Sequence, residues 1–121
     1  MISAPERDLE NLKYIREYCV NCAKFLDEID NSRERFFEDI CYRDAVSWTI
    51  FRASIISEHL SKEFKDAHPK TYWSQLDSLR EIIGHNYHDI DWETIWQTAV
   101  IIIPEIREFC DQILKNKSKS E

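Results

Sequence analysis

The sequence predicts an all-α protein, a four-helix bundle with one short helix and a kinked last helix. Glycine occurs once and proline three times in 121 residues, too few for the tight turns of an all-β fold. Apolar residues instead recur three and four positions apart, which is the spacing of a helix face. With 43% hydrophobic and 32% charged residues, the chain has the balance of one globular domain. We assign residues 1–114 to this domain and residues 115–121 to a flexible polar tail.

The first helix is predicted from about Glu6 to Ile29. One stripe of this segment holds its apolar side chains, Leu12, Ile15, Cys19, Cys22, Leu26 and Ile29. Cys19 and Cys22 have the Cys-x-x-Cys spacing of redox centres and of half zinc sites. A redox pair of this kind belongs at a helix start beside a strand, and no strand is predicted here, so we interpret both sulfurs as core.

The second helix is predicted to start between Ser32 and Glu38 and to run to about Phe64. Apolar side chains cover more than one side of it, at Phe36, Phe37, Ile40, Ala45, Trp48, Phe51, Ile55, Ile56 and Leu60. A helix of this kind is either central or in contact with a second subunit. His68-Pro69 ends the segment, because a residue before proline leaves the helical region.

A short third helix is predicted from Trp73 to Ile83, ended by Gly84, which can take a left-handed cap without steric cost. The fourth helix begins after Asp91, a favourable N-cap. Pro104 lies inside its apolar pattern and is expected to kink it.

The composition excludes several classes of function. The single glycine rules out glycine-rich phosphate loops and dinucleotide-binding fingerprints. The net charge of −7 leaves no overall basic surface, so any nucleic-acid chemistry needs a local basic pocket. The N-terminus has no apolar leader, and no run is long enough to cross a bilayer. We therefore expect a cytoplasmic protein with reduced cysteines, no membrane contact and no cofactor.

His85 is the histidine that stands out. It follows the only glycine and lies among Arg80, Asn86, Tyr87 and His88. Composition alone leaves two interpretations open, a structural loop histidine and a catalytic one. A zinc site that includes His85 and His88 is disfavoured, because their spacing is shorter than the usual interval of about three to five residues. We therefore expect no metal.

The segment Arg80-Glu81-Ile82-Ile83-Gly84-His85-Asn86-Tyr87 resembles the Arg, four residues, His, one residue, Tyr motif of the HepT-like branch of the HEPN superfamily. The resemblance extends from about Leu9 to Leu114. It includes the stretches YRDAVSWTIF, HLSKEFKDAHPKTYWSQLDSLREIIGHNYHDIDWETIW and IIIPEIREF, in the order and spacing that the family uses.

This resemblance implies an all-helical, homodimeric, metal-independent endoribonuclease. Such proteins act as toxins and pair with a small nucleotidyltransferase antitoxin, MNT. By resemblance, Arg80 and His85 carry out RNA cleavage, and Tyr87 is the residue to which the antitoxin attaches AMP. Asn86 and His88 are possible supporting residues.

The chemistry suits these residue types. In metal-free RNA cleavage a 2′-hydroxyl attacks the adjacent phosphorus, and an imidazole with a pKa near about 6.5 can take its proton. A guanidinium can hold the charge that builds on the phosphate oxygens. Residues five apart lie roughly 140° apart around a helix, so Arg80 and His85 cannot share one face of an unbroken helix. Either the helix ends at Gly84 and the chain folds His85 back, or two subunits bring their motifs together.

Three features depart from the family pattern. The stretch Ser54-Ile55-Ile56-Ser57 carries no carboxylate where the family commonly has an acidic segment. Glu81 follows the arginine, where a neutral or short polar residue is commoner, and His88 replaces an aromatic residue. Two other functions therefore remain open. One is a non-catalytic substrate-binding subunit of a nucleotidyltransferase complex, and the other is a dimeric helical adaptor.

Overall fold

The structure, a computed structural model, describes residues 3–120, without the side chains of residues 4, 87 and 118–120. Helices account for nearly all of this range, and it contains no strand. Four long helices form the frame: α1 (Ala4–Glu28), α3 (Ile40–Glu58), α5 (Thr71–His85) and α7 (Ile103–Ser120). The all-α prediction is confirmed.

The first helix agrees with the sequence pattern. Ser3 caps α1 by accepting a hydrogen bond from the backbone N–H of Glu6, and Pro5 lies in the first turn, where its missing N–H costs nothing. The predicted apolar stripe is buried throughout, from Leu12 to Ile29. Asp30 and Asn31 then adopt positive φ angles of 57° and 53°, and this left-handed pair reverses the chain.

The predicted second helix is wrong in its extent, because it is three helices in the structure. These are α2 (Arg33–Glu38), α3 and α4 (Lys62–Ala67). Asp39 leaves the helical region with φ −116° and ψ 104°, and its carboxylate accepts from the N–H of Cys41. Ser61 caps α4 by accepting from the N–H of Phe64. A side chain that caps a new helix favours ending the preceding helix at that point. The hydrophobic periodicity does not show such an end, because it continues across the boundary.

The predicted end of the third helix at Gly84 is also wrong. Helix α5 runs through Gly84 to His85, and Gly84 has no positive φ. The cap is Asn86, whose N–H donates to the carbonyl oxygen of Ile82 at 2.8 Å. The following residues form the 3-10 turn η1 (Tyr87–Asp89).

The last helical segment is irregular just before Pro104, where the sequence predicts a kink. Asp91 caps α6 (Trp92–Gln97) by accepting from the N–H of Glu93. A π-helical stretch, η2 (Thr98–Ile102), then leads into α7, whose second residue is Pro104. The wider π turn lies directly before the proline, which can donate no backbone hydrogen bond. Helix α7 continues through Ser120, beyond the boundary at residue 114 expected from the sequence.

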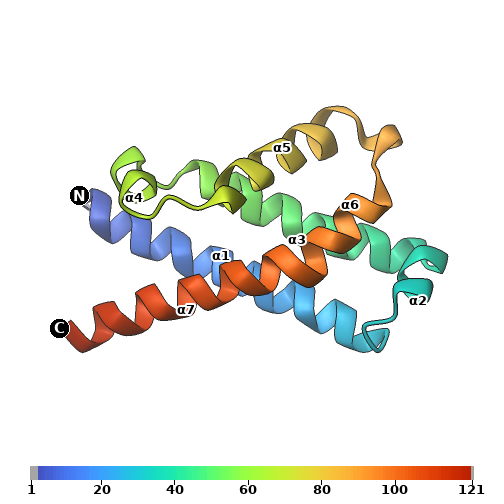
Figure 1. Cartoon of the computed structure of the whole chain (residues 1–121), viewed down its shortest axis with the longest axis horizontal. Coiled ribbons are helices and arrows are strands. Elements are labelled where there is room, and N and C mark those ends of the chain that lie inside the picture. Colours follow the sequence, from blue (N-terminus) through green and yellow to red (C-terminus); the bar gives the residue numbers. More distant parts are fainter. Residues whose placement is uncertain (1–2, 121) are drawn as a thin grey trace.

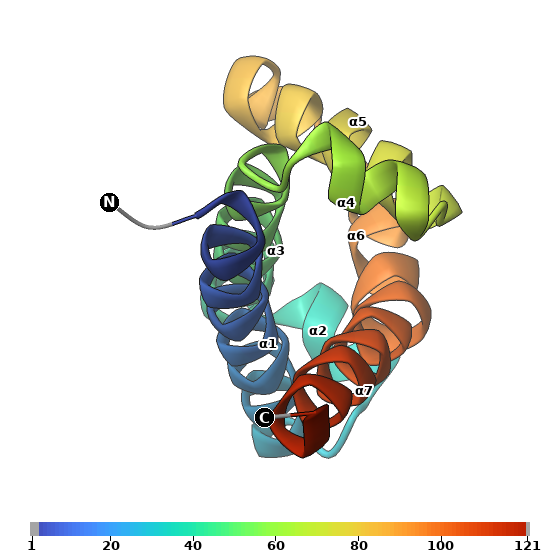
Figure 2. The ribbon, with the colours of Figure 1, turned by 90° about the vertical axis from the view of Figure 1, so that its left-hand side faces the viewer.

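The helices pack in a fixed order. Helix α1 packs against both α3 and α7, and α5 packs against α3 (Figure 1). Viewed end-on, α3 lies between α1 and α5 (Figure 2). The core is built from fully buried residues of these helices, among them Leu12, Ile15, Ile50, Leu76, Ile95 and Ile106. No helix among the described residues combines the length and the apolar character that crossing a bilayer requires.

Candidate active site

Arg80 is surrounded by three carboxylates. Its Nε lies 2.8 Å from Oε1 of Glu58 on α3, and its Nη2 lies 2.8 Å from Oε1 of Glu81 and 3.4 Å from Oδ1 of Asp77. The Glu58 oxygen is out of line with the Nε–H bond, so this contact is an ion pair and not a hydrogen bond. The Arg80 side chain is 21% exposed, which leaves part of its guanidinium open to solvent.

These carboxylates affect the pKa of the Arg80 guanidinium. Desolvation alone would lower the pKa of the guanidinium, but the attraction of Glu58 and the hydrogen bonds to Glu81 and Asp77 outweigh it and raise the pKa. Arg80 is therefore a permanent cation, and its charge is shared with neighbouring acids. A phosphate that approaches this site has to compete with those acids.

Glu58 is a site residue that the sequence analysis missed. The stretch 54–57 lacks a carboxylate, but the next residue supplies one, at the last turn of α3. Glu58 follows Phe51 by seven residues, or two helical turns, so both side chains face α5. Phe51 passes close to Gly84, since its Cε2 lies 3.7 Å from where a Cβ would stand on that glycine. This helical register was the available signal for Glu58.

His85 is the last residue of α5, and its side chain is 71% exposed. Its Nε2 lies 3.9 Å from Oε2 of Glu81, while the other oxygen of Glu81 accepts from Arg80. Glu81 therefore lies between the two residues that the motif predicts to be catalytic. The three side chains share the exposed end of α5.

Helix continuity excludes one of the two geometries left open by the sequence. The chain does not fold back at Gly84, because α5 is unbroken from Arg80 to His85. The two side chains therefore leave the helix roughly 140° apart, and one protomer alone does not place them face to face.

The supporting residues lie just beyond this end of the helix. Asn86 and His88 are exposed, and Asn86 caps α5 through its backbone. Tyr87, the predicted AMP acceptor, is the first residue of η1, and its side chain lies outside the described part of the structure.

An exposed aromatic surface adjoins the site. The Trp48 side chain is 56% exposed, and its ring centroid lies 5.7 Å from that of Phe51. Because Phe51 lies beside Gly84, this surface borders the helix end that carries His85. Trp48 therefore exposes apolar area next to the candidate site.

The Cys-x-x-Cys pair belongs to the core, as we interpreted it. Cys19 and Cys22 are each 1% exposed, and burial raises the pKa of the Cys22 thiol to about 11. Such thiols remain protonated and poorly reactive near neutral pH. Among the described residues, no three His, Cys, Asp or Glu side chains are grouped so that they could share a metal ion.

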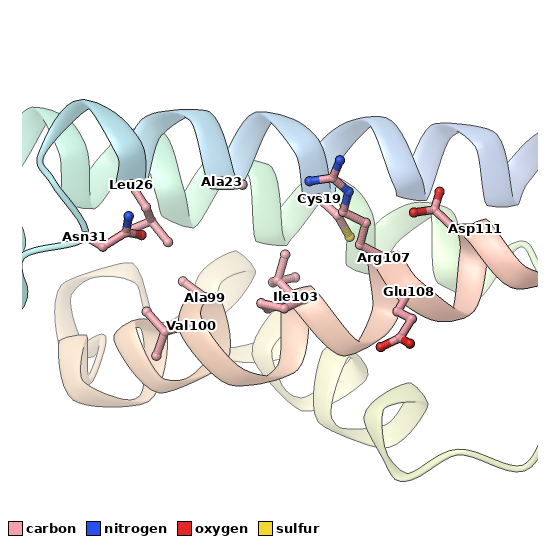
Figure 3. A pocket seen from close by; sticks show the side chains of 11 residues that line it. Cys19, Ala23, Leu26, Asn31, Ala99, Val100, Ile103, Arg107, Glu108 and Asp111 are labelled. Atoms are coloured by element: carbon pink, nitrogen blue, oxygen red, sulfur yellow. The ribbon is translucent and has the colours of Figure 1, made fainter.

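A separate cavity of about 310 Å³ lies between α1 and the segment from η2 to α7. Apolar side chains such as Ala99 and Ile103 line it, and Arg107 extends from α7 toward α1 beside Asp111 (Figure 3). Asp111 is already ion-paired with Arg16. None of the residues predicted to be catalytic lines this cavity, so it is distinct from the Arg80–His85 site.

Comparison with known proteins gives one family. The model of the ribonuclease HepT-like family matches residues 9–113, which is most of the chain. No solved structure gives a significant match.

Curated relatives carry similar names. "Putative RNase MJ0125" and "Putative RNase MJ1216", both from Methanocaldococcus jannaschii, are each 25% identical over 117 residues. These alignments cover 93% of this chain and 96% and 92% of the two relatives. "Putative RNase TTE0752" from Caldanaerobacter subterraneus subsp. tengcongensis is 29% identical over 85 residues, covering 67% of this chain and 76% of the relative.

Proposed function

This chain belongs to the HepT-like ribonuclease family, and from that premise we propose that it is a metal-independent endoribonuclease whose cleavage depends on Arg80 and His85. The observation that carries the proposal is the shared contact with Glu81. A guanidinium and an exposed imidazole therefore lie on either side of one carboxylate at the end of α5, where an RNA strand would meet both.

In the proposed reaction His85 accepts the proton of a ribose 2′-hydroxyl. The 2′-oxygen attacks the adjacent phosphorus, a new P–O bond forms, and the bond from phosphorus to the 5′-oxygen breaks. The products are a 2′,3′-cyclic phosphate and a 5′-hydroxyl, with the departing oxygen protonated by an acid or by water. Arg80 stabilises the negative charge on the non-bridging oxygens, which is greatest in the transition state.

We propose a homodimer whose interface includes the exposed aromatic surface formed by Trp48 and Phe51. Burial of Trp48 and Phe51 removes apolar area from water, which favours association. Because this surface borders the end of α5, a two-fold contact brings two Arg80–His85 pairs together. A second imidazole is then available to protonate the leaving 5′-oxygen.

The family also suggests how the activity is controlled. We propose that an MNT-type nucleotidyltransferase antitoxin attaches AMP to Tyr87, making this chain the toxin of the pair. Tyr87 follows His85 by two residues in the turn η1, between the exposed Asn86 and His88. An adenylyl group there adds bulk and negative charge next to His85, and both oppose the entry of a phosphate.

Cleavage of single-stranded RNA by the purified protein in EDTA tests the proposal. We expect fragments that end in 2′,3′-cyclic phosphate, and we expect their formation to be lost in Arg80→Ala while the circular dichroism spectrum is unchanged. If Arg80→Ala cleaves as fast as the wild type, the assignment of Arg80 is wrong.

One observation favours a second function. Three carboxylates surround Arg80 and compete with phosphate for its charge, which is unusual for a phosphate-binding arginine. This arrangement favours a non-catalytic subunit that binds a nucleotidyltransferase. The same assay separates the two functions. Cleavage by the unmodified protein supports the nuclease, whereas stable binding to the nucleotidyltransferase with no cleavage of any RNA supports the binding subunit.

A further inference from the structure

A second hollow opens beside Arg80, between α3, α4 and the first half of α5. It has a volume of about 370 Å³ and is lined by Ser54, Ser57, Glu58, Lys65, Trp73, Ser74 and Asp77. Glu58 and Asp77 also contact the Arg80 guanidinium, so the hollow adjoins the candidate active site directly. We call it the Lys65 pocket.

Among the residues that the structure describes, Lys65 is the only cation that lines this pocket. Its side chain is half-buried, and no carboxylate within the described residues forms an ion pair with it. By contrast, Lys62 on the same short helix places its Nζ 2.5 Å from Oδ2 of Asp66. Glu58 and Asp77 are engaged with Arg80, so Lys65 is the positive charge of the pocket that remains available to a ligand anion.

The rest of the pocket lining is rich in hydrogen-bond acceptors. The Ser54 hydroxyl donates to the carbonyl oxygen of Phe51 at 2.6 Å, and the Ser74 hydroxyl donates to that of Thr71 at 2.9 Å. Because both protons are used on the backbone, these hydroxyls can only accept hydrogen bonds from a ligand, and the exposed Ser74 is the more accessible of the two. With the carboxylates of Glu58 and Asp77, they form a surface that accepts hydrogen bonds from hydroxyl groups.

A ligand that matches the pocket therefore carries an anion on one side and hydroxyl groups on the other. We propose that the Lys65 pocket binds the ribose and phosphate of the nucleotide next to the scissile phosphate. Ser74 precedes Arg80 by six residues, an axial distance of about 9 Å along the helix, and Glu58 and Asp77 line the pocket and also contact Arg80, so neighbouring parts of one RNA strand can reach both. This inference rests on the proposed function, because it requires RNA at Arg80.

Binding measurements in the His85→Ala background, which prevents cleavage, test the proposal. The probe is a fluorescent single-stranded RNA, titrated at several salt concentrations. We expect Lys65→Ala to weaken binding by about three- to tenfold and to reduce the slope of log K against log salt by about 0.7, the contribution of one phosphate contact to a single strand. Lys65→Arg keeps the charge and should restore both values.

Lys62→Ala is the matched control, because it removes the same charge from the same helix at a residue outside the pocket. If Lys65→Ala and Lys62→Ala weaken RNA binding equally, the proposed RNA-binding role of the Lys65 pocket is wrong. Cleavage by the wild type in the same preparation would then show that the proposed nuclease activity does not depend on that role. If the His85→Ala protein does not bind RNA, the proposed role of the Lys65 pocket is wrong. If the wild type also fails to cleave RNA, the proposed function is wrong as well.

Discussion

Glu58 Oε1 lies 2.8 Å from Nε of Arg80, across the contact between α3 and α5. This ion pair joins the last turn of one long helix to the predicted catalytic residue of another. It fixes one edge of the guanidinium and leaves Nη1 without a carboxylate contact among the described residues. A fixed guanidinium aimed at a phosphate needs little reorganisation when negative charge develops.

Glu58→Gln should lower kcat for RNA cleavage by about tenfold with little change in KM, because Arg80 is then less well positioned. Single-turnover kinetics with one RNA, together with urea unfolding, measure the effect. Glu63→Gln, which alters an exposed carboxylate on α4, is the control. A loss of activity in Glu58→Gln that merely follows a loss of folded protein would contradict the positioning role.

Glu81→Gln should strengthen RNA binding by about two- to fivefold at low salt, because it removes a carboxylate that competes with phosphate for Arg80. Titration of labelled RNA in the His85→Ala background measures this change. Glu34→Gln on α2, at a residue outside the Arg80 site, changes the net charge equally and serves as the control. Weaker binding by Glu81→Gln would mean that Glu81 holds Arg80 in place and does not compete with RNA.

Gly84→Ala should stabilise the protein by about 0.5–1 kcal/mol, because glycine inside a helix loses more backbone entropy on folding than alanine does. The added Cβ would meet Phe51 Cε2 at 3.7 Å, an ordinary van der Waals contact, and no positive φ is required. Urea unfolding of the two proteins gives the difference. A clear destabilisation would mean that Gly84 is a left-handed cap after all.

Trp48→Glu should convert the proposed dimer to a monomer and reduce cleavage with it, because a charge at the proposed interface opposes burial of the apolar surface. Light scattering after gel filtration measures the mass. Ile101→Glu alters another exposed apolar residue, 49% exposed and located on η2, and should leave the mass unchanged. If the Trp48→Glu protein has the same mass in solution as the wild type, Trp48 does not lie in a dimer interface.

The sequence predicted the fold where side-chain spacing alone decides it. The stripe from Leu12 to Ile29, the cap at Asp91 and the interruption near Pro104 all depend on local physics. The boundaries inside the predicted second helix are also set locally, by the Asp39 and Ser61 caps, but the apolar spacing continues across both and conceals them. Gly84 was misassigned for a related reason. Glycine permits a left-handed cap but does not require one, and packing beside Phe51 favours the helix.

The candidate site was predictable only in part. The motif pointed to Arg80 and His85 by resemblance, and the roles of both remain proposals. The carboxylates around Arg80 come from two helices, so the helical register could place Glu58 on the same face as Phe51, but only the packing of α3 against α5 shows that it contacts Arg80. The same holds for Lys65, which shares a pocket with Ser74 because α4 lies over the start of α5.

Cleavage of RNA by the His85→Ala protein is the most direct test of the proposed mechanism. The wild type, His85→Ala and His59→Ala are compared in EDTA with one RNA under single-turnover conditions, His59 being an exposed histidine at the end of α3. Removal of a general base slows cleavage by about 10²–10⁴-fold, and we predict a loss of this size for His85→Ala only. Cleavage by folded His85→Ala at the wild-type rate would contradict the role of this imidazole in the reaction.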